Sequence, residues 1–207
     1  MAAVPPPPRE GMMDPPNERA AGPRPVAAQS PSWRPGDARA DVPAMLRVDQ
    51  AGEYGATRIY AGQLAVLGDR HPAARVISRM ATQERRHLDI FDKMIADRAV
   101  RPTLLQPVWN VAGHALGAVT ALMSPRAAMA CTAAVETEID RHYGEQLAAL
   151  GDDDPDLAAT IGEFRGEELE HRAAAIAAGA EQVPGYPILS AFIRAGCRAA
   201  IALSKRI

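Results

Sequence analysis

Residues 53–69 read EYGATRIYAGQLAVLGD, and residues 136–152 read ETEIDRHYGEQLAALGD. Both stretches begin with a Glu and share the Arg, Tyr, Gln, Leu, Leu, Gly and Asp that follow at the same positions. Self-similarity of this length indicates an internal repeat of a helical unit. Each copy then continues through a turn into a second helical stretch, so the repeat predicts two related helical hairpins.

The second helix of each hairpin carries a Glu followed three residues later by a His. Residues at this spacing project from one side of a helix. The apolar residues of all four helices recur with helical periodicity, and the Glu and His positions fall on the same apolar stripes. The six candidate metal ligands are Glu53, Glu84, His87, Glu136, Glu168 and His171.

Metal ions would solve the electrostatic problem that these stripes create. Burying unpaired carboxylates costs several kcal/mol each, and two divalent cations would balance the four glutamates. One Glu from each of two helices plus ExxH from the other two is the pattern of di-iron and di-manganese carboxylate bundles. A single ExxH more often means a solvated Glu and an ordinary His, but two matched copies favour a dinuclear site. The spacing does not choose between iron and manganese.

The composition favours an all-α fold, here a ferritin-like four-helix bundle with additional helices. Of the 207 residues 47% are hydrophobic but only 4% aromatic, and the abundant Ala and Leu are strong helix formers. A net charge of −2 gives no basic field for nucleic acid. Cys131 and Cys197 form no CxxC pair, which argues against a zinc knuckle or a disulfide framework.

We expect a domain over residues 41–207, preceded by a disordered Pro-rich tail over residues 1–40. A docking arm is the alternative role for the tail, and its start lacks the pattern of a signal peptide. An Asp or Ser that can cap a helix, followed by a Pro in the first turn, marks the expected helix starts, and turns that contain Gly separate the helices. The expected helices cover about 41–67, a stretch from 72, 125–150, a stretch from 155, and 188–204.

The stretch 104–123, LLQPVWNVAGHALGAVTALM, contains no charged residue. Its length approaches that of a membrane span, but Pro107, Asn110 and His114 make it a poor spanning helix. A buried helix or a helix at a membrane surface fits better.

Other polar residues near the predicted ligands have open roles. Tyr60 and Tyr143 lie on the stripes of Glu53 and Glu136, where each could bond a ligand carboxylate, take part in redox chemistry or simply pack in the core. Asp49 and Asp140 could orient the ligating histidines or be solvated. His142 and His114 lie outside the ExxH pattern and are not predicted as ligands.

Five segments resemble the demethoxyubiquinone hydroxylases, the di-iron mono-oxygenases of ubiquinone biosynthesis. They are VDQAGEYGATRIYAGQLAVL, QERRHL, RPTLLQPVWNVAGHALGAVTAL, AMACTAAVETEIDRHYGEQL and EELEHR. The similarity runs from about Met45 to the C-terminus. AGEYGA with a downstream RPT-to-WN segment is specific to that family, whereas ExxH alone would indicate only the ferritin-like superfamily.

The resemblance implies that all six predicted ligands bind iron. It implies hydroxylation, with O2, of the ring of a polyprenylated methoxy-methyl-benzoquinol. It also places His142 and Tyr143 near the substrate and electron route, as catalytic candidates. No GxGxxG motif indicates a resident nicotinamide or flavin cofactor, so electrons would come from the quinol, from NADH acting through the quinone, or from a separate reductase.

The prenyl tail of such a substrate lies in a membrane. The resemblance therefore implies a peripheral protein on the cytoplasmic face of a bacterial-type membrane, with residues 104–123 and the last helix at the interface. Gly113, Gly117 and Ala121 would permit close packing or a lipid groove. Ordinary burial or a homo-oligomer interface is the alternative for these segments, and accessory proteins of ubiquinone biosynthesis are further possible partners.

Three rival functions remain at the level of sequence. A ferritin-like ferroxidase would use the same ligands, although the uncharged segment argues against a soluble shell. A tRNA-base hydroxylase would need a basic surface. A non-catalytic membrane adaptor would bind no metal.

Overall fold

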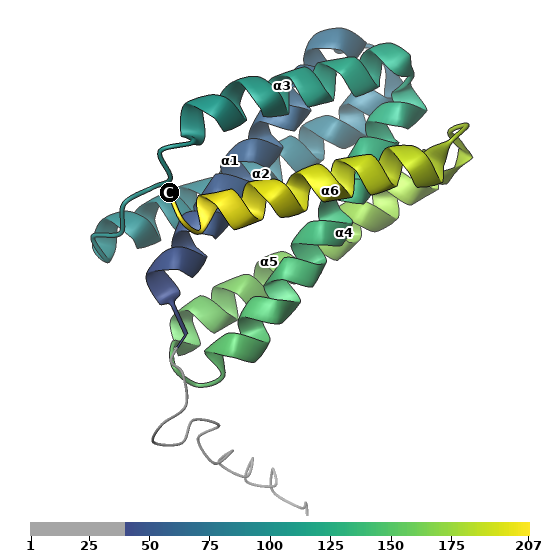
Figure 1. Ribbon diagram of the computed structural model, residues 1–207. Coiled ribbons are helices and arrows are strands. Elements are labelled where there is room, and N and C mark those ends of the chain that lie inside the picture. Colours follow the sequence, from purple (N-terminus) through teal and green to yellow (C-terminus); the bar gives the residue numbers. More distant parts are fainter. Residues whose placement is uncertain (1–39) are drawn as a thin grey trace, which may run out of the picture. The chain divides into compact units, whose positions relative to one another are not determined.

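The computed structural model describes residues 40–207, and within them it contains helices and no strand (Figure 1). The predicted all-α fold is confirmed, whereas the predicted tail over residues 1–40 falls almost wholly outside the described residues. The elements are α1 (Val42–Leu67), α2 (Pro72–Asp97), α3 (Gln106–Met123), α4 (Pro125–Leu150), α5 (Pro155–Ala177), the short 3-10 helix η1 (Ala180–Gln182) and α6 (Tyr186–Ser204).

Helices α1, α2, α4 and α5 begin within one residue of their predicted starts, because side-chain caps precede prolines at their first turns. Helix α6 begins two residues before its predicted start and has no side-chain cap. Asp41, Ser124 and Asp154 each accept a hydrogen bond from a backbone N–H of the first turn, at 3.0–3.1 Å. The two repeat turns end their helices with Gly68 and Gly151, both at positive φ. A glycine adopts this conformation without the steric cost that other residues meet.

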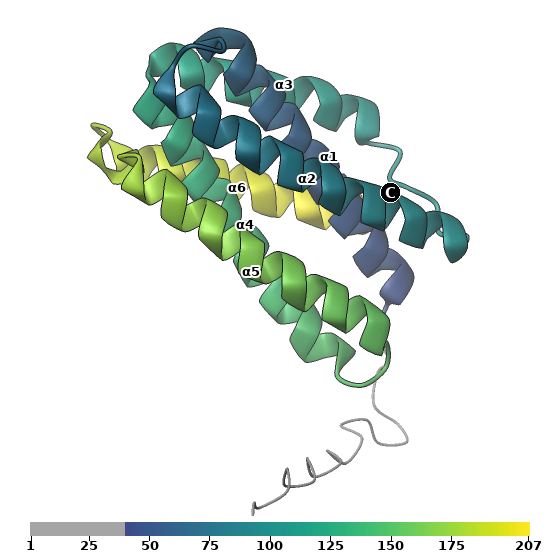
Figure 2. The same ribbon diagram turned by 180° about the vertical axis from the view of Figure 1, so that it is seen from behind.

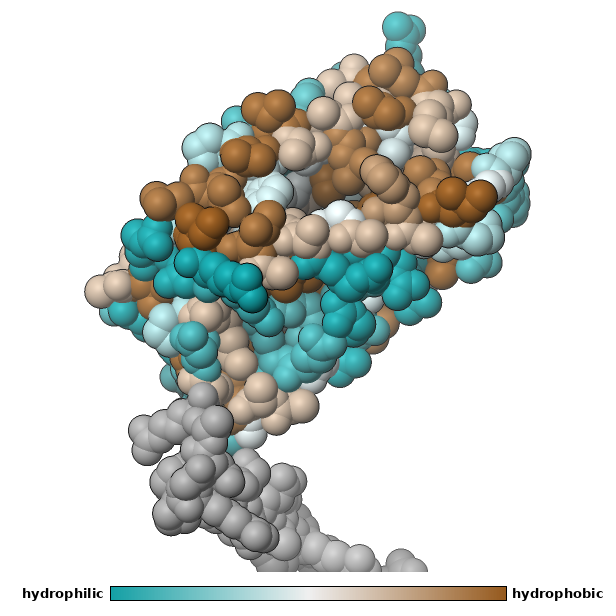
Figure 3. Space-filling model, in the orientation of Figure 1, coloured by the Kyte–Doolittle hydropathy of each residue, from teal (hydrophilic) through white to brown (hydrophobic). Residues whose placement is uncertain are grey.

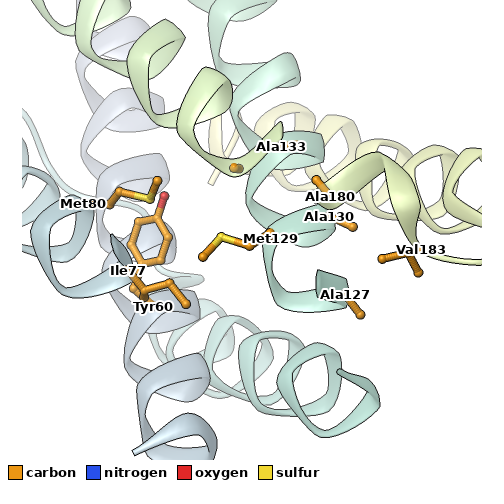
Figure 4. Packing of buried hydrophobic residues seen from close by; sticks show 10 residues of the cluster. Tyr60, Ile77, Met80, Ala127, Met129, Ala130, Ala133, Ala180 and Val183 are labelled. Atoms are coloured by element: carbon orange, nitrogen blue, oxygen red, sulfur yellow. The ribbon is translucent and has the colours of Figure 1, made fainter. Parts of the chain in front are cut away.

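Helices α1 and α2 form one hairpin and α4 and α5 the other, and together they make a four-helix bundle. Seen from behind, α2 and α5 lie nearest the viewer (Figure 2). Helix α3 packs along α1, and α6 packs mainly along α4. The bundle core contains two large apolar clusters, one around Tyr60, Ile77, Met80 and Met129 (Figure 4) and the other around Tyr143.

Helix α3 is held against α1 by backbone contact at glycines. A Cβ atom on Gly117 would overlap the carbonyl oxygen of Ile59, and one on Gly62 would overlap the carbonyl oxygen of His114. The small residues of α3 therefore serve close packing. Pro107 lies in the first turn of α3, so it opens this helix and does not interrupt it.

Among the described residues, α6 is the one helix with the length and mean hydropathy of a membrane span, and 17% of that stretch is buried. Only Ile193 and Ser204 of this helix are buried. Length and composition alone do not place α6 in a membrane, and they do not explain why its apolar side chains are exposed.

Replacing Gly117 with Ala should destabilise the fold, because the new methyl group forces α3 away from α1. Overpacking of this kind costs about 1–3 kcal/mol of the free energy of unfolding, which urea denaturation would measure. Gly162→Ala is the matched control, since its Cβ meets nothing within 4 Å and Ala is the better helix former. Equal stabilities of the two variants would contradict the close contact between α1 and α3.

Candidate metal centre

The six carboxylate and imidazole side chains predicted as metal ligands lie together in the bundle core. Each is 3% exposed or less. They come from α1, α2, α4 and α5, so both hairpins are needed to assemble the cluster. They form two groups whose ligand atoms lie within 4.8 Å of one another: Glu53, Glu84, His87 and Glu168, and Glu84, Glu136, Glu168 and His171.

Glu84 and Glu168 belong to both groups. His87 Nδ1 lies 3.1 Å from Glu168 Oε1, and His171 Nδ1 lies 3.1 Å from Glu84 Oε1. Each ExxH glutamate thus faces the histidine of the opposite hairpin. Glu84 and Glu168 are therefore shared by the two groups, whereas Glu53 belongs to one group and Glu136 to the other.

The oxygens of this cluster fit metal ions better than they fit hydrogen bonds. Burial without a partner is costly for a carboxylate oxygen, and a cation in contact with it removes that cost. Buried atoms of the cluster that lack a hydrogen-bond partner are Glu53 Oε2, Glu84 Oε1 and Oε2, Glu136 Oε2, Glu168 Oε1 and His87 Nδ1.

Both histidines are oriented from outside the cluster. The Nε2 atoms of His87 and His171 lie 3.0 Å from Glu167 Oε2 and Gln83 Oε1, respectively. These oxygens only accept hydrogen bonds, so each Nε2 donates a proton outward and each Nδ1 faces the carboxylates. Sequence analysis missed Gln83 and Glu167, although each directly precedes the Glu of an ExxH motif.

The two aspartates considered for this orienting role do not fill it. Asp49 is buried and accepts a hydrogen bond from Gln146 Nε2 at 2.8 Å, and its Oδ1 lies 3.5 Å from His142 Nε2. Asp140 forms an ion pair with Arg165 at 2.7 Å. His142 therefore lies beside Asp49, and neither it nor His114, which lies 3.5 Å from Arg58, belongs to either ligand group.

Each of the two tyrosines contacts a glutamate of the other hairpin. The hydroxyl of Tyr60 donates to Glu136 Oε1 at 2.7 Å, and the hydroxyl of Tyr143 donates to Glu53 Oε1. Burial and the neighbouring carboxylates raise the pKa of both phenols well above the ordinary value. Both hydroxyls therefore stay protonated and act as donors that hold the two terminal glutamates.

The crowded carboxylates strongly shift one another's pKa values. Burial, with repulsion from the other carboxylates, raises the pKa of Glu84 and Glu136. Burial also opposes the charge on Glu168 and His87, but contacts between oppositely charged groups outweigh it. The pKa of Glu168 falls to about 2 through His171 and His87, and the pKa of His87 rises to about 10 through Glu168 and Glu53. The cluster attracts positive charge.

Fold and site together define a class, the four-helix bundles with a carboxylate–histidine cluster in the core. The family described as "Ubiquinone biosynthesis protein COQ7" matches residues 40–204. The chain belongs to this family.

Individual relatives agree with the family match. The chain is 58% identical over 162 residues to a 3-demethoxyubiquinol 3-hydroxylase of Rhodospirillum rubrum, covering 78% of this chain and 76% of the relative. It is 50% identical over 173 residues to a human mitochondrial protein named NADPH-dependent 3-demethoxyubiquinone 3-hydroxylase, covering 82% and 79%. A yeast mitochondrial 5-demethoxyubiquinone hydroxylase is 41% identical over 179 residues, covering 79% and 77%.

The metal-free protein should lose stability as the pH rises from 6.5 to 10. The pKa of His87 is raised from 6.5 to about 10 on folding, so its contribution is complete below pH 6.5 and is lost as the pH approaches 10. The raised pKa values of Glu84 and Glu136 act in the same direction. Urea denaturation of chelator-treated protein across this range would measure the fall.

Saturation with a divalent cation should remove most of this pH dependence, because bound ligands stay deprotonated. A free energy of unfolding that rises with pH in the chelated protein would contradict the assigned contacts.

Proposed function

We propose that this protein is a di-iron mono-oxygenase that hydroxylates the ring of a polyprenylated methoxy-methyl-benzoquinol, demethoxyubiquinol, in ubiquinone biosynthesis. The observation that carries the proposal is a buried six-ligand cluster in a chain whose relatives are named as hydroxylases of this substrate. A ferritin-like ferroxidase is not favoured, because the names of these relatives describe quinol hydroxylation.

Glu53, Glu84, His87, Glu136, Glu168 and His171 would hold the two iron ions, which when bound supply the electrons and coordination sites for reaction with O2. The donor set of carboxylates and imidazoles suits this metal. Glu84 and Glu168, which belong to both groups of ligand atoms, would supply carboxylate oxygens to the centre. Glu167 and Gln83 hold the histidine rings with Nε2 turned outward and Nδ1 toward the cluster, so Nδ1 is the atom that would bind metal once its proton is displaced.

The substrate would occupy a cavity of about 380 Å³ between α1, α3, α4 and α6. Gly52, which precedes Glu53 on α1, lines this cavity, and so does Val135, which precedes Glu136 on α4, although the six candidate ligands do not. Apart from Glu138, the lining is mostly apolar or small. Such walls exclude water from the quinol ring and leave room for a prenyl tail.

His142 and Tyr143 would assist at the centre in different ways. Tyr143 holds Glu53 by its hydroxyl. His142, 5% exposed, lies beside Asp49, and this pair would exchange protons during the reaction. The mammalian relatives are named as NADPH-dependent, and we propose an external nicotinamide such as NADH or NADPH as the reductant.

Iron-loaded protein, mixed with a short-chain demethoxyubiquinone, NADH and O2, should yield a product heavier by one oxygen atom on the ring. Mass spectrometry of the quinones would measure it. Oxygen consumption without ring oxygenation would instead favour ferroxidase chemistry or another substrate.

Glu168→Ala should lose most of the bound iron and all of the product, because this carboxylate faces both histidines. Glu170→Ala, an exposed position on the same helix, is the matched control and should keep both. Normal iron content in Glu168→Ala would refute the ligand assignment.

We further propose that α3 and α6 rest on the surface of a membrane, at the cytoplasmic face in a bacterial cell. Large apolar residues are exposed along these helices, as the brown areas of Figure 3 indicate. Burying such side chains in the lipid interface is favourable, and the cavity between the same helices would then open toward the prenyl tail. The residues are Leu104, Val108, Val111, Val119, Leu122, Met123, Ile188, Phe192, Leu203 and Ile207.

The double variant Leu122→Ser/Ile188→Ser should bind vesicles of phosphatidylcholine and phosphatidylglycerol at least tenfold more weakly. Each side chain is more than 70% exposed, and burying one in lipid contributes about 1.5–3 kcal/mol. Co-sedimentation measures the binding. Leu169→Ser on α5, an exposed apolar position on another helix, should bind as the wild type does, and a wild type that does not sediment would refute the membrane surface.

A further inference from the structure

Helix α6 forms one wall of the cavity although few of its side chains are buried. Ile193 and Ser204 are its buried residues. Its C-terminal end is fixed by two polar contacts: Trp109 Nε1 donates to Ser204 Oγ at 3.0 Å, and Arg47 donates to the carbonyl oxygen of Lys205 at 3.2 Å. The middle of the helix, where Phe192, Gly196 and Cys197 line the cavity, needs another anchor.

That anchor is the carboxylate of Glu138 on α4. Its side chain is fully buried. Glu138 Oε1 accepts hydrogen bonds from Arg194 Nε at 2.6 Å and from Arg198 Nη1 at 2.7 Å, two residues one turn apart on α6. Glu138 Oε2 accepts from Arg141 Nε at 2.9 Å. One buried charge thus ties two successive turns of α6 to α4.

The ion pairs and the cavity share a wall. Glu138 itself lines the cavity, together with its neighbour Ile139 and with α6 residues on both sides of Arg194 and Arg198. Burial opposes the charge of Glu138, but the guanidinium groups outweigh it and lower the pKa of this carboxyl group. It stays ionised, and pairs at a buried carboxylate are screened by salt much less than surface pairs.

We propose that Glu138 is a positioning residue that, through Arg194 and Arg198, holds α6 where it closes the quinol cavity and so sets the affinity for the quinol. This inference rests on the proposed function of the cavity. Loss of the carboxylate would leave two guanidinium groups without their partner and would release the middle of α6. The wall would then move away from α1, and the ring would be held less closely.

The test compares Glu138→Gln with Glu145→Gln. Glu145 lies on the same helix and also pairs with Arg141, but it is exposed and has no contact with the arginines of α6. A Trp33→Phe background leaves Trp109, which lines the cavity, as the sole tryptophan. Quenching of its fluorescence by a short-chain demethoxyubiquinone would report binding directly.

In Glu138→Gln the Kd for this quinone should rise about tenfold, with a matching rise in KM and a kcat within about threefold of the wild type. The amides of residues 188–200 should exchange hydrogen faster. Iron content should stay normal, and Glu145→Gln should resemble the wild type throughout. Arg194→Gln should shift Kd and amide exchange in the same direction by a smaller amount, because Arg198 still pairs with Glu138. Adding Arg194→Gln to Glu138→Gln should change little, because Glu138→Gln has already broken the contact with Arg194.

Unchanged Kd and exchange in both Glu138→Gln and Arg194→Gln would overturn the proposal, and so would loss of iron in either variant. A wild type that neither binds nor hydroxylates the quinone would refute the proposed function instead. The exchange rates would still decide whether Glu138 holds α6.

Discussion

Four glutamate carboxylates lie in the core of this bundle, and the rest of the molecule is arranged around the need to neutralise them. An unpaired buried carboxylate is strongly unfavourable, yet several oxygens of the cluster have no hydrogen-bond partner. Two histidines and two tyrosine hydroxyls supply the polar contacts that protein alone can give. The remaining charge is what a pair of divalent cations would balance, so metal binding and bundle stability are coupled.

The two hairpins of the repeat neutralise these carboxylates through contacts with each other's side chains. Each hairpin provides two Glu and one His to the cluster, and each tyrosine donates a hydrogen bond to a Glu of the other hairpin. Contacts between the hairpins continue outside the cluster, where Gln83 of α2 and Glu167 of α5 each orient the His of the opposite hairpin. Neither hairpin could complete these contacts alone.

The two outer helices, α3 and α6, form walls of the cavity and are held to the bundle in different ways. Helix α3 packs so closely on α1 that glycines are required at the contact, which makes it a fixed wall of the cavity. Helix α6 has few buried residues and relies on ion pairs with Glu138. The cavity thus has one rigid side and one side held by charge, while both helices present apolar residues outward.

The helices and the six candidate ligands could be predicted from the sequence, because both follow from local patterns. Caps such as Asp41 and Ser124 mark helix starts, and ExxH places its two side chains on one face of a helix whatever the surrounding fold. The family resemblance followed from the same repeat and its neighbouring segments.

Contacts between helices could not be predicted, because they depend on how helices distant in the chain are rotated and set against one another. The orienting role considered for Asp49 and Asp140 was wrong for this reason, since the tertiary structure turns one toward His142 and the other toward Arg165. Glu138, two residues from a predicted ligand, was not singled out from the sequence, because its partners Arg194 and Arg198 lie on a distant helix. The sequence by itself determined which side chains would enter the core, and only the packing of six helices decided which partners they meet there.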